Sequence, residues 1–167
     1  MAVDIPRLFR HLFAPSARRL FPADSLQRIA AAIAAGELRH RGEICFAVEP
    51  SLHPGRVLAG MQPRDRALEA FAQLRVWDTH ANNGVLVHLL LADHRIELIA
   101  DRGLDGLVSA EQWRGVCQAM EERMRAGEGE AAVIAGVATI SDLLAAHFPR
   151  MPGDHDDNEL PDLPHLL

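Results

Sequence analysis

Residues 79–104, THANNGVLVHLLLADHRIELIADRGL, contain two apolar runs joined by a short polar connection. The first run, 85–92, is rich in Val and Leu and has the length of a buried strand. Asp93-His94 separates it from a second extended run, 95–100, and a connection this short allows two strands to pair only in the antiparallel sense. The loop before the first strand and the loop after the second therefore lie at the same end of the sheet.

The segments before this hairpin add a parallel strand to it. Residues 43–49 form another apolar strand, and Pro63 begins a helix with one apolar face. A strand, helix, strand connection of this length favours a parallel pair with a right-handed crossover. A helix from about residue 24 to 40 precedes the first strand, and Asp24 with Gln27 predicts a capping box at its start.

Two helices follow the hairpin and complete the domain. Ser109 with Gln112 predicts a capping box that opens the first helix, and the second runs from about residue 130 to 147. We expect one domain, at residues 23–149, with the α/β fold of a three-layer α/β/α sandwich. Its small mixed sheet has three or four strands, a parallel pair plus an antiparallel hairpin strand.

The two ends of the chain carry opposite charge. Residues 1–22 form a basic arm in which four arginines alternate with Leu and Phe, and Pro15 divides it into two amphipathic pieces. Such an arm either caps the core or lies on an anionic membrane surface, where each Arg contributes about 1 kcal/mol. We expect it to cap the core, because short helices are marginal without burial. Residues 150–167 form an acidic, proline-rich tail, in which we expect no regular structure and which can pair with the arm.

Composition excludes several classes of protein. The formal net charge of −6 argues against general nucleic-acid binding, which needs clustered positive charge. The N-terminus lacks the pattern of a secretory signal, and no apolar run approaches the roughly 20 residues of a membrane-spanning helix. We therefore expect a cytoplasmic protein, with peripheral membrane contact through the N-terminal arm as the alternative.

Four short motifs, in this order and spacing, resemble the TPM-domain family: RGEI at 41–44, NGVL at 83–86, DHR at 93–95 and RGL at 102–104. The resemblance spans about residues 23–149, and NELPD at 158–162 is similar to the ending of soluble bacterial members. The family includes a thylakoid-lumen acid phosphatase and a photosystem II repair protein. It implies an α/β sandwich, with divalent-cation binding or weak phosphate-ester hydrolysis in some members.

Polar side chains gather in the two loops that the hairpin brings together. Carboxylate and amide oxygens are what a hard cation such as Ca²⁺ or Mg²⁺ requires, which makes four of these residues predicted metal ligands. These are Asp78, Asn82, Asp101 and Asp105, and the candidate site also includes Glu43, Asn83, Arg102 and Gly103. Gly103 is expected at a turn where φ can be positive.

The family pattern and the local turns leave this site open to a second interpretation. Many family members resemble Gly-x-Gly where this chain has Asp101-Arg102-Gly103, which adds an acid and an Arg that can neutralise it. In the alternative interpretation, Asp78 and Asp101 cap adjacent structure and residues 82–84 only turn the chain.

Other motifs do not support catalysis or a second metal site. Cys117 and Arg123 match the spacing of cysteine phosphatases, but that chemistry needs a loop and these residues are predicted within a helix. Residues 154–158 mimic the start of a calcium loop without its required Gly and Glu. The histidines are scattered singly, and His88 alternates with leucines on a strand, as a core histidine does.

Two functions remain. The first is a non-catalytic binding or accessory module, dependent on a divalent cation, that docks on a partner protein or a membrane-associated complex. The second is a weak phosphate-ester hydrolase in which Asp78 or Asp101 holds a metal that activates water. We favour the binding module, because the chain shows no dense ligand cluster and no nucleophile with an evident partner base.

Overall fold

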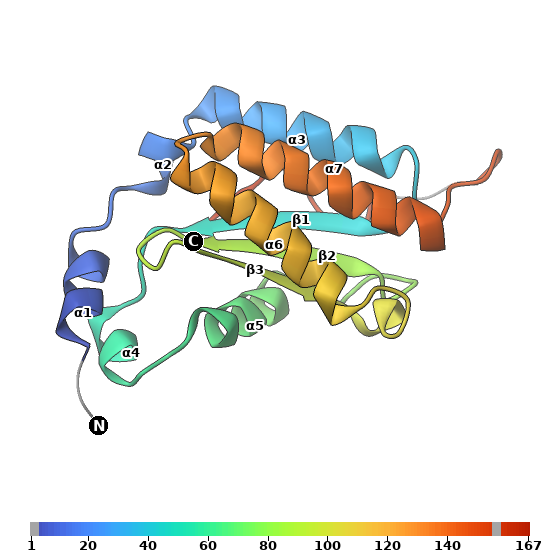
Figure 1. Cartoon of the computed structure of the whole chain (residues 1–167). Coiled ribbons are helices and arrows are strands. Elements are labelled where there is room, and N and C mark those ends of the chain that lie inside the picture. Colours follow the sequence, from blue (N-terminus) through green and yellow to red (C-terminus); the bar gives the residue numbers. More distant parts are fainter. Residues whose placement is uncertain (1–3, 155–157) are drawn as a thin grey trace.

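The computed structural model describes residues 4–154 and 158–167. These residues form seven α-helices, a single turn of 3₁₀-helix and four strands (Figure 1). In chain order they are α1 (Ile5–Leu12), α2 (Ala17–Leu20), α3 (Ala23–Glu37), β1 (Glu43–Glu49), α4 (Pro54–Leu58), α5 (Pro63–Gln73), β2 (Gly84–Leu90), β3 (Arg95–Ala100), η1 (Arg102–Leu104), α6 (Ala110–Arg125), α7 (Gly129–His147) and β4 (His165–Leu166).

The four strands form one mixed sheet in the order β3-β2-β1-β4. β1 and β2 run parallel, with Glu43 opposite Gly84, and β2 pairs antiparallel with β3. The parallel pair and the hairpin expected from the sequence are thus confirmed. At the hairpin turn His94 adopts a left-handed backbone with φ of 52°.

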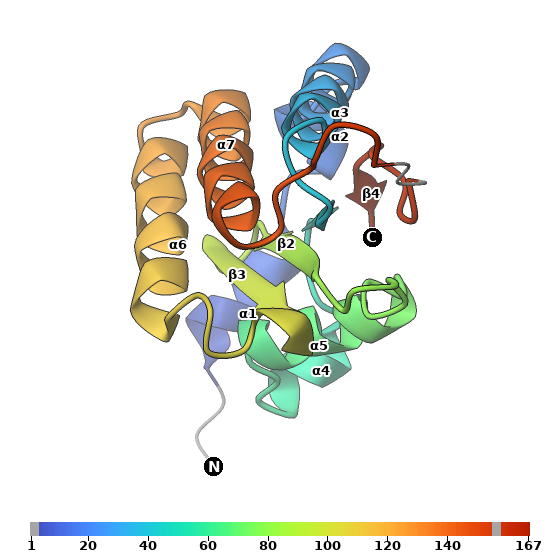
Figure 2. The same ribbon diagram turned by 90° about the vertical axis from the view of Figure 1, so that its right-hand side faces the viewer.

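Helices cover both faces of the sheet, which confirms the three-layer α/β/α sandwich. α3, α6 and α7 lie on one face and α5 on the other (Figures 1 and 2). Side chains from alternate strand positions separate accordingly. Val85 and Val87 belong to the large cluster under α3, α6 and α7, whereas Cys45 and Leu86 pack with buried alanines of α5. The strands are buried on both faces, which explains why they read as continuous apolar runs.

The starts of two helices agree with the sequence-based predictions, and the start of a third differs from its prediction. α5 begins at Pro63, and α6 begins with the capping box expected from Ser109 and Gln112. The capping box expected at Asp24 is wrong, because Pro22 occupies the N-cap of α3 and has no side-chain oxygen to accept a hydrogen bond.

α7 differs from the expectation that no segment approaches membrane-spanning length. By length and composition it is the one described helix that could cross a membrane. In the folded chain, however, Val133, Val137, Ile140 and Leu144 are buried in the main core cluster. Core helices of folded domains meet the same criterion, so this finding carries no further conclusion about a membrane.

The N-terminal arm is divided between core and solvent. Phe21 is completely buried and meets Phe46 edge to face at 5.7 Å, so this part of the arm caps the core as expected. Phe9 and Phe13, which we also expected to be covered, are exposed. Their helix, α1, packs on α4 through its opposite side.

The C-terminal tail contributes regular structure, contrary to expectation. His165 and Leu166 form β4 on the free edge of β1, because a two-residue strand can follow the prolines without including them. Within the described residues, the arginines of the arm make their ion pairs with Asp93 and none with the tail, so the pairing that the opposite charges allow does not form there. Asp156 and Asp157 lie outside the described residues.

Candidate functional site

The two predicted loops meet at one end of the sheet, here called the loop end, which faces the viewer in Figure 2. It consists of residues 78–84, which lead into β2, and 101–105, which follow β3. The Gly103 N–H donates to the Asn82 carbonyl oxygen at 2.8 Å, and Arg102 Nε donates to Asn82 Oδ1 at 3.1 Å. The Asp101 N–H bonds the Gly84 carbonyl oxygen at 2.9 Å. The predicted convergence of the loops is therefore confirmed.

Position 103 requires glycine because the backbone of the facing loop lies very close to it. Its φ is not positive, contrary to our expectation, whereas Asn82 in the facing loop has φ of 52°. A Cβ on Gly103 would lie 2.4 Å from the Asn82 carbonyl oxygen and 2.5 Å from that of Ala81. Only glycine allows the two loops to be this close.

Asp101 is the carboxylate that the loop end places inward. It is 9% exposed, and its Oδ1 accepts from the Arg102 N–H at 2.8 Å. Its Oδ2 is buried and meets no hydrogen-bond donor in the described part of the chain. A buried carboxylate oxygen without a donor is unfavourable, and a bound cation removes that penalty.

Asn83, in the loop that leads into β2, has a second buried side-chain oxygen. Its N–H donates to Thr79 Oγ1 at 3.1 Å, and its Nδ2 donates to the Arg41 carbonyl oxygen at 2.9 Å. These bonds fix the side chain, which is completely buried, while Oδ1 has no donor among the described residues. Amide oxygens are common Ca²⁺ ligands.

The other predicted ligands lie further out. Asp78 is exposed and pairs with Arg75, and Asp105 is exposed on the far side of η1. Residues 4–154 and 158–167 contain no group of three or more His, Cys, Asp and Glu side chains placed to hold a metal ion. A cation at the loop end would therefore use Asp101 together with amide and main-chain oxygens. That it binds there stays a prediction.

The tail crosses the loop end. The only sign of this in the sequence was that residues 158–162 are similar to the ending of soluble bacterial family members. Glu43, buried at the start of β1, accepts from the N–H groups of Glu159 and Leu160 at 3.3 and 3.2 Å. The Glu159 carboxylate in turn accepts from the His80 N–H at 2.8 Å, and the Leu160 side chain is buried. The tail thus joins the start of β1 to the loop that leads into β2.

Glu37, at the end of α3, adds a carboxyl group beside Glu43. Burial raises the pKa of Glu37 to about 8, and the nearby Glu43 and Asp162 contribute to the increase, although a hydrogen bond from the Ile44 N–H acts in the opposite direction. The loop end therefore contains one carboxyl group that is largely protonated at neutral pH.

Neither cysteine has the properties of a catalytic thiolate. Cys117 lies in the middle of α6, as predicted, and burial raises its pKa to about 11. Burial also raises the pKa of Cys45, on β1, to about 12. Both thiols remain protonated at neutral pH, so the cysteine-phosphatase spacing has no chemical counterpart.

His88 is a core histidine, as predicted. Its Nε2 lies 3.2 Å from Glu49 Oε2, and Arg66 Nε donates to the same oxygen at 2.8 Å. Burial would raise the pKa of Glu49, but the hydrogen bonds and charges of His88 and Arg66 outweigh it and lower the pKa. The group is a carboxylate held between the Arg66 guanidinium and the His88 ring under α5.

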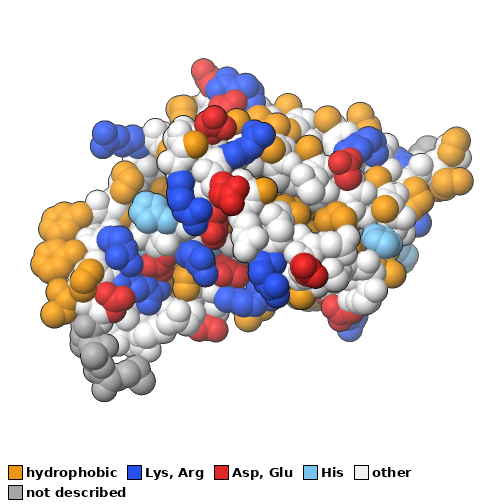
Figure 3. Space-filling model, in the orientation of Figure 1, with side chains coloured by type: hydrophobic (Ala, Val, Ile, Leu, Met, Phe, Trp, Pro, Cys, Tyr) orange, Lys and Arg blue, Asp and Glu red, His pale blue; other side chains and the backbone are white. Residues whose placement is uncertain are grey.

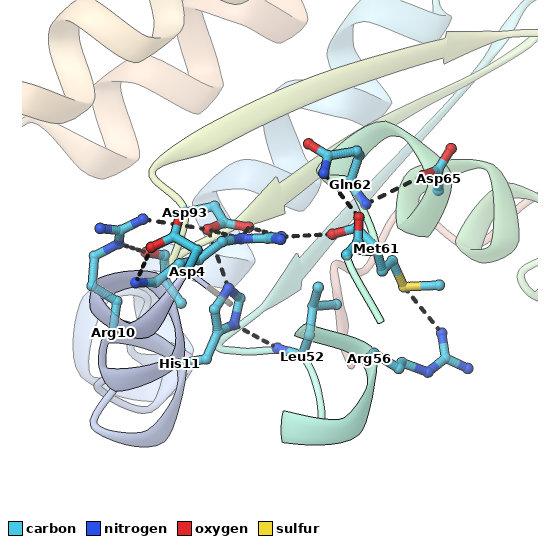
Figure 4. Close-up of polar contacts among 12 residues, drawn as sticks. Asp4, Arg10, His11, Leu52, Arg56, Met61, Gln62, Asp65 and Asp93 are labelled. Atoms are coloured by element: carbon cyan, nitrogen blue, oxygen red, sulfur yellow. Dashed lines mark hydrogen bonds and ion pairs between the residues drawn. The ribbon is translucent and has the colours of Figure 1, made fainter. Parts of the chain in front are cut away.

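A second cluster of this kind lies at the opposite end of the hairpin, here called the turn end, and the sequence analysis did not find it (Figure 4). Arg7 donates to the Asp93 carboxylate at 2.9 Å from Nε and 2.7 Å from Nη2. His11 Nε2 lies 3.1 Å from Asp93 Oδ1, and His11 Nδ1 accepts from the Leu52 N–H at 2.9 Å. Because Nδ1 is an acceptor, Nε2 carries the proton that faces Asp93.

The turn end is held by contacts across 86 residues of sequence, which no local pattern could reveal. Burial would raise the pKa of Asp93, but the hydrogen bonds and charge of Arg7, together with His11, outweigh it and lower the pKa. Arg7 and His11 lie four residues apart on one face of α1, but Arg10 and apolar side chains share the helix, so this spacing does not show which face is buried.

Comparison with known proteins identifies related folds. The model of the TPM domain matches residues 17–143. A solved structure, the NMR structure of the BA42 protein from the psychrophilic bacterium Bizionia argentinensis, is 25% identical, with a TM-score of 0.76 over 87% of this chain and 94% of that one. No curated protein matches the sequence.

Proposed function

This chain belongs to the TPM-domain family, and we propose that it is a non-catalytic binding or accessory module whose loop end takes a divalent cation, Ca²⁺ or Mg²⁺. In this proposal the bound cation orders the two loops and the tail, and the ordered surface docks on a protein or a membrane-associated complex. A location in the cytoplasm, peripheral to a membrane, belongs to the same proposal.

The buried Oδ2 of Asp101 is the observation that supports the cation. It lacks a donor among the described residues, in a loop whose geometry is fixed by Gly103 and Asn82. Asn83 Oδ1 has the same property in the facing loop. Because Asp101 is the one buried carboxylate of the two loops, we expect weak binding, with a Kd of about 10⁻⁴–10⁻³ M.

Two observations support a binding role over hydrolysis. The thiols have raised pKa values and cannot act as nucleophiles at neutral pH. Hydrolytic metals are usually held by several charged ligands, and the described residues contain no such group. Arg102, beside the site, donates to Asn82 and so positions a loop.

A titration with CaCl₂ or MgCl₂, followed by backbone amide chemical shifts, tests the proposal. We expect saturable shifts confined to residues 78–84, 101–105 and the tail. Asp101→Asn should abolish them, because the amide keeps the shape of the side chain and loses its charge. Asp142→Asn, which removes an exposed acid from α7, is the matched control and should leave them intact. Wild-type protein without shifts in the two loops would refute the cation site.

Hydrolysis of para-nitrophenyl phosphate tests the non-catalytic part separately. We expect no turnover above a heat-denatured sample. Metal-dependent turnover that persists through purification and is lost in Asp101→Asn would show that the loop end is a weak phosphate-ester hydrolase.

A further inference from the structure

α1 is an amphipathic helix with its polar side turned inward. The side that faces the protein carries Arg7 and His11, whose side chains are 11% and 0% exposed where they hold Asp93. The side that faces solvent carries an apolar stripe, defined here as Ile5, Phe9, Leu12 and Phe13, with exposed fractions of 58%, 55%, 52% and 77%. Surface helices normally have the reverse arrangement.

The buried ion cluster keeps the stripe outside. Rotating α1 to bury its phenylalanines would pull Arg7 and His11 away from Asp93 and leave a buried carboxylate unpaired, which is strongly unfavourable. The rings of Phe9 and Phe13 stack on each other, with centroids 6.0 Å apart, so the stripe is a preformed apolar surface. Figure 3 shows hydrophobic side chains gathered at the end of the molecule that α1 occupies in Figure 1.

Arginines border this surface. Arg18 and Arg19 on α2 are exposed, and in the described part of the chain their guanidinium groups meet no carboxylate. Arg10 is half exposed and reaches Asp93 only at 4.0 Å. Of the nearby acids, Asp93 is held by Arg7 and Glu121 by Arg125 at 3.3 Å, while Asp4 caps the start of α1 by accepting from the Arg7 N–H. The chain as a whole has a net charge of −6, so this positive region is local.

A cavity of about 770 Å³ adjoins the stripe at Phe13. Its walls combine apolar side chains from the sheet and α6 with basic side chains from the arm and α6, an arrangement suited to an anionic amphiphile. The apolar walls include Leu20, Leu89, Leu91, Ile96 and Met124, the basic ones are Arg10, Arg19 and Arg125, and His94 and Glu121 also line the cavity.

We propose that the apolar stripe of α1 docks on an anionic lipid bilayer, with the phenylalanines inserted among the acyl chains and Arg10, Arg18 and Arg19 at the phosphate level. The cavity beside Phe13 then receives a lipid headgroup between its arginines. This inference rests on the proposed function in one respect only: that the protein acts by docking. It does not require a cation at the loop end, which lies at the other end of the hairpin.

Charge complementarity favours the bilayer over a second copy of the chain. In a two-fold symmetric contact through the stripe, the arginines of one copy would face the same arginines of the other. An anionic membrane attracts these arginines and is repelled by the acidic remainder of the molecule, which orients the protein with α1 toward the lipid.

Co-sedimentation of the full chain with vesicles of phosphatidylglycerol and phosphatidylcholine tests this inference. We expect binding at low salt that weakens as salt rises, and no binding to pure phosphatidylcholine. Phe9→Ser/Phe13→Ser should weaken binding at least about tenfold, and Arg18→Gln/Arg19→Gln about tenfold or more.

The matched controls are Leu38→Ser, which removes an apolar side chain that is 74% exposed elsewhere, and Arg114→Gln/Arg123→Gln, which removes the same charge from α6. Both should bind as wild type does.

Three results would overturn the proposal. These are no binding to anionic vesicles, binding that the phenylalanine and arginine variants leave unchanged, and a solution dimer that Phe9→Ser/Phe13→Ser dissociates. Circular dichroism melting of each variant confirms that these exposed substitutions leave the fold intact. Amide shifts with Ca²⁺ at the loop end would persist in all of them, so failure here is distinguishable from failure of the cation site.

Discussion

The hairpin of β2 and β3 has an aspartate at each end, and the two differ in how completely their carboxylates are hydrogen-bonded. Asp93, at the turn end, is held by Arg7 and His11. Asp101, at the loop end, is as well buried but keeps one oxygen without a donor in the described residues. A carboxylate whose partners come from its own chain stabilises the fold, whereas one that is buried and incompletely paired is a candidate ligand.

The terminal segments reinforce this difference. The basic arm crosses the turn end and supplies the Arg7 guanidinium and the His11 ring for Asp93. The acidic tail crosses the loop end, where Glu159 bonds His80 and where Asp162 lies near Glu37. The Asp93 carboxylate at one end of the hairpin is therefore neutralised, while at the other end Asp101 stays incompletely paired and further acidic residues lie nearby.

Deleting residues 1–22 should have the largest effect, because it removes the whole covering of the turn end. Loss of the buried Phe21 alone should destabilise by about 3–5 kcal/mol, and Asp93 also loses both Arg7 and His11. We expect aggregation or a far lower melting temperature. Deleting residues 163–167, which form only the short β4 strand, should have a much smaller effect. A stable, soluble protein without the arm would contradict its role in capping the core.

Asp93→Asn tests the turn end without removing the arm. It leaves the buried Arg7 without its counter-charge and His11 without its acceptor, and we expect a loss of about 3–5 kcal/mol in the free energy of unfolding, measured with urea. Asp101→Asn should change stability much less, because the amide oxygen can still accept from the Arg102 N–H. Equal losses in the two variants would show that both aspartates are structural.

Gly103→Val tests whether the loop end must be closely packed. The new Cβ would overlap the carbonyl oxygens of Asn82 and Ala81, so we expect a loss of about 1–3 kcal/mol in stability. Gly115→Ala is the matched control, since nothing lies near its Cβ on α6, and it should be neutral or slightly stabilising. An unchanged melting temperature in Gly103→Val would mean that the loops can separate freely.

Glu37→Gln should act mainly through the dependence of stability on pH. The pKa of Glu37 is raised from 4.5 to about 8, so its contribution to stability is fully present below pH 4.5 and is lost as pH rises through 8. Gln resembles the protonated form, and the variant should lose less stability than wild type between pH 5 and pH 8.5. Parallel melting curves for the two proteins over this range would show that Glu37 is solvated.

The sequence predicted the sheet and the meeting of the loops because both follow from local signals. The two-residue connection at Asp93 and the apolar runs beside it determine the hairpin, and the hairpin alone brings 78–84 and 101–105 together. Gly103 was identified for the wrong reason, since its backbone is ordinary and the constraint comes from the facing loop.

The remaining features depend on contacts between distant parts of the chain. Nothing near Glu43 in sequence shows that Glu159 and Leu160 will bond it, and nothing in the arm shows that Arg7 will turn inward. The amphipathic pattern predicted that one side of the arm would be buried. It did not show whether that side would be the one with Arg7 or the one with Phe9. The Arg side is buried because Arg7 pairs with Asp93, which is 86 residues away in sequence.

Thermal unfolding in the presence of Ca²⁺ tests the difference between the two aspartates most directly. At about ten times the Kd, the melting temperature of the wild type should rise by about 2–5 °C, because the cation binds the folded chain. Asp93→Asn should start from a lower temperature and show the same rise, as should Asp142→Asn from an unchanged starting point. Asp101→Asn should show none. A rise in Asp101→Asn equal to that of the wild type, or no rise in the wild type, would contradict the assignment of Asp101 as the open ligand of the loop end.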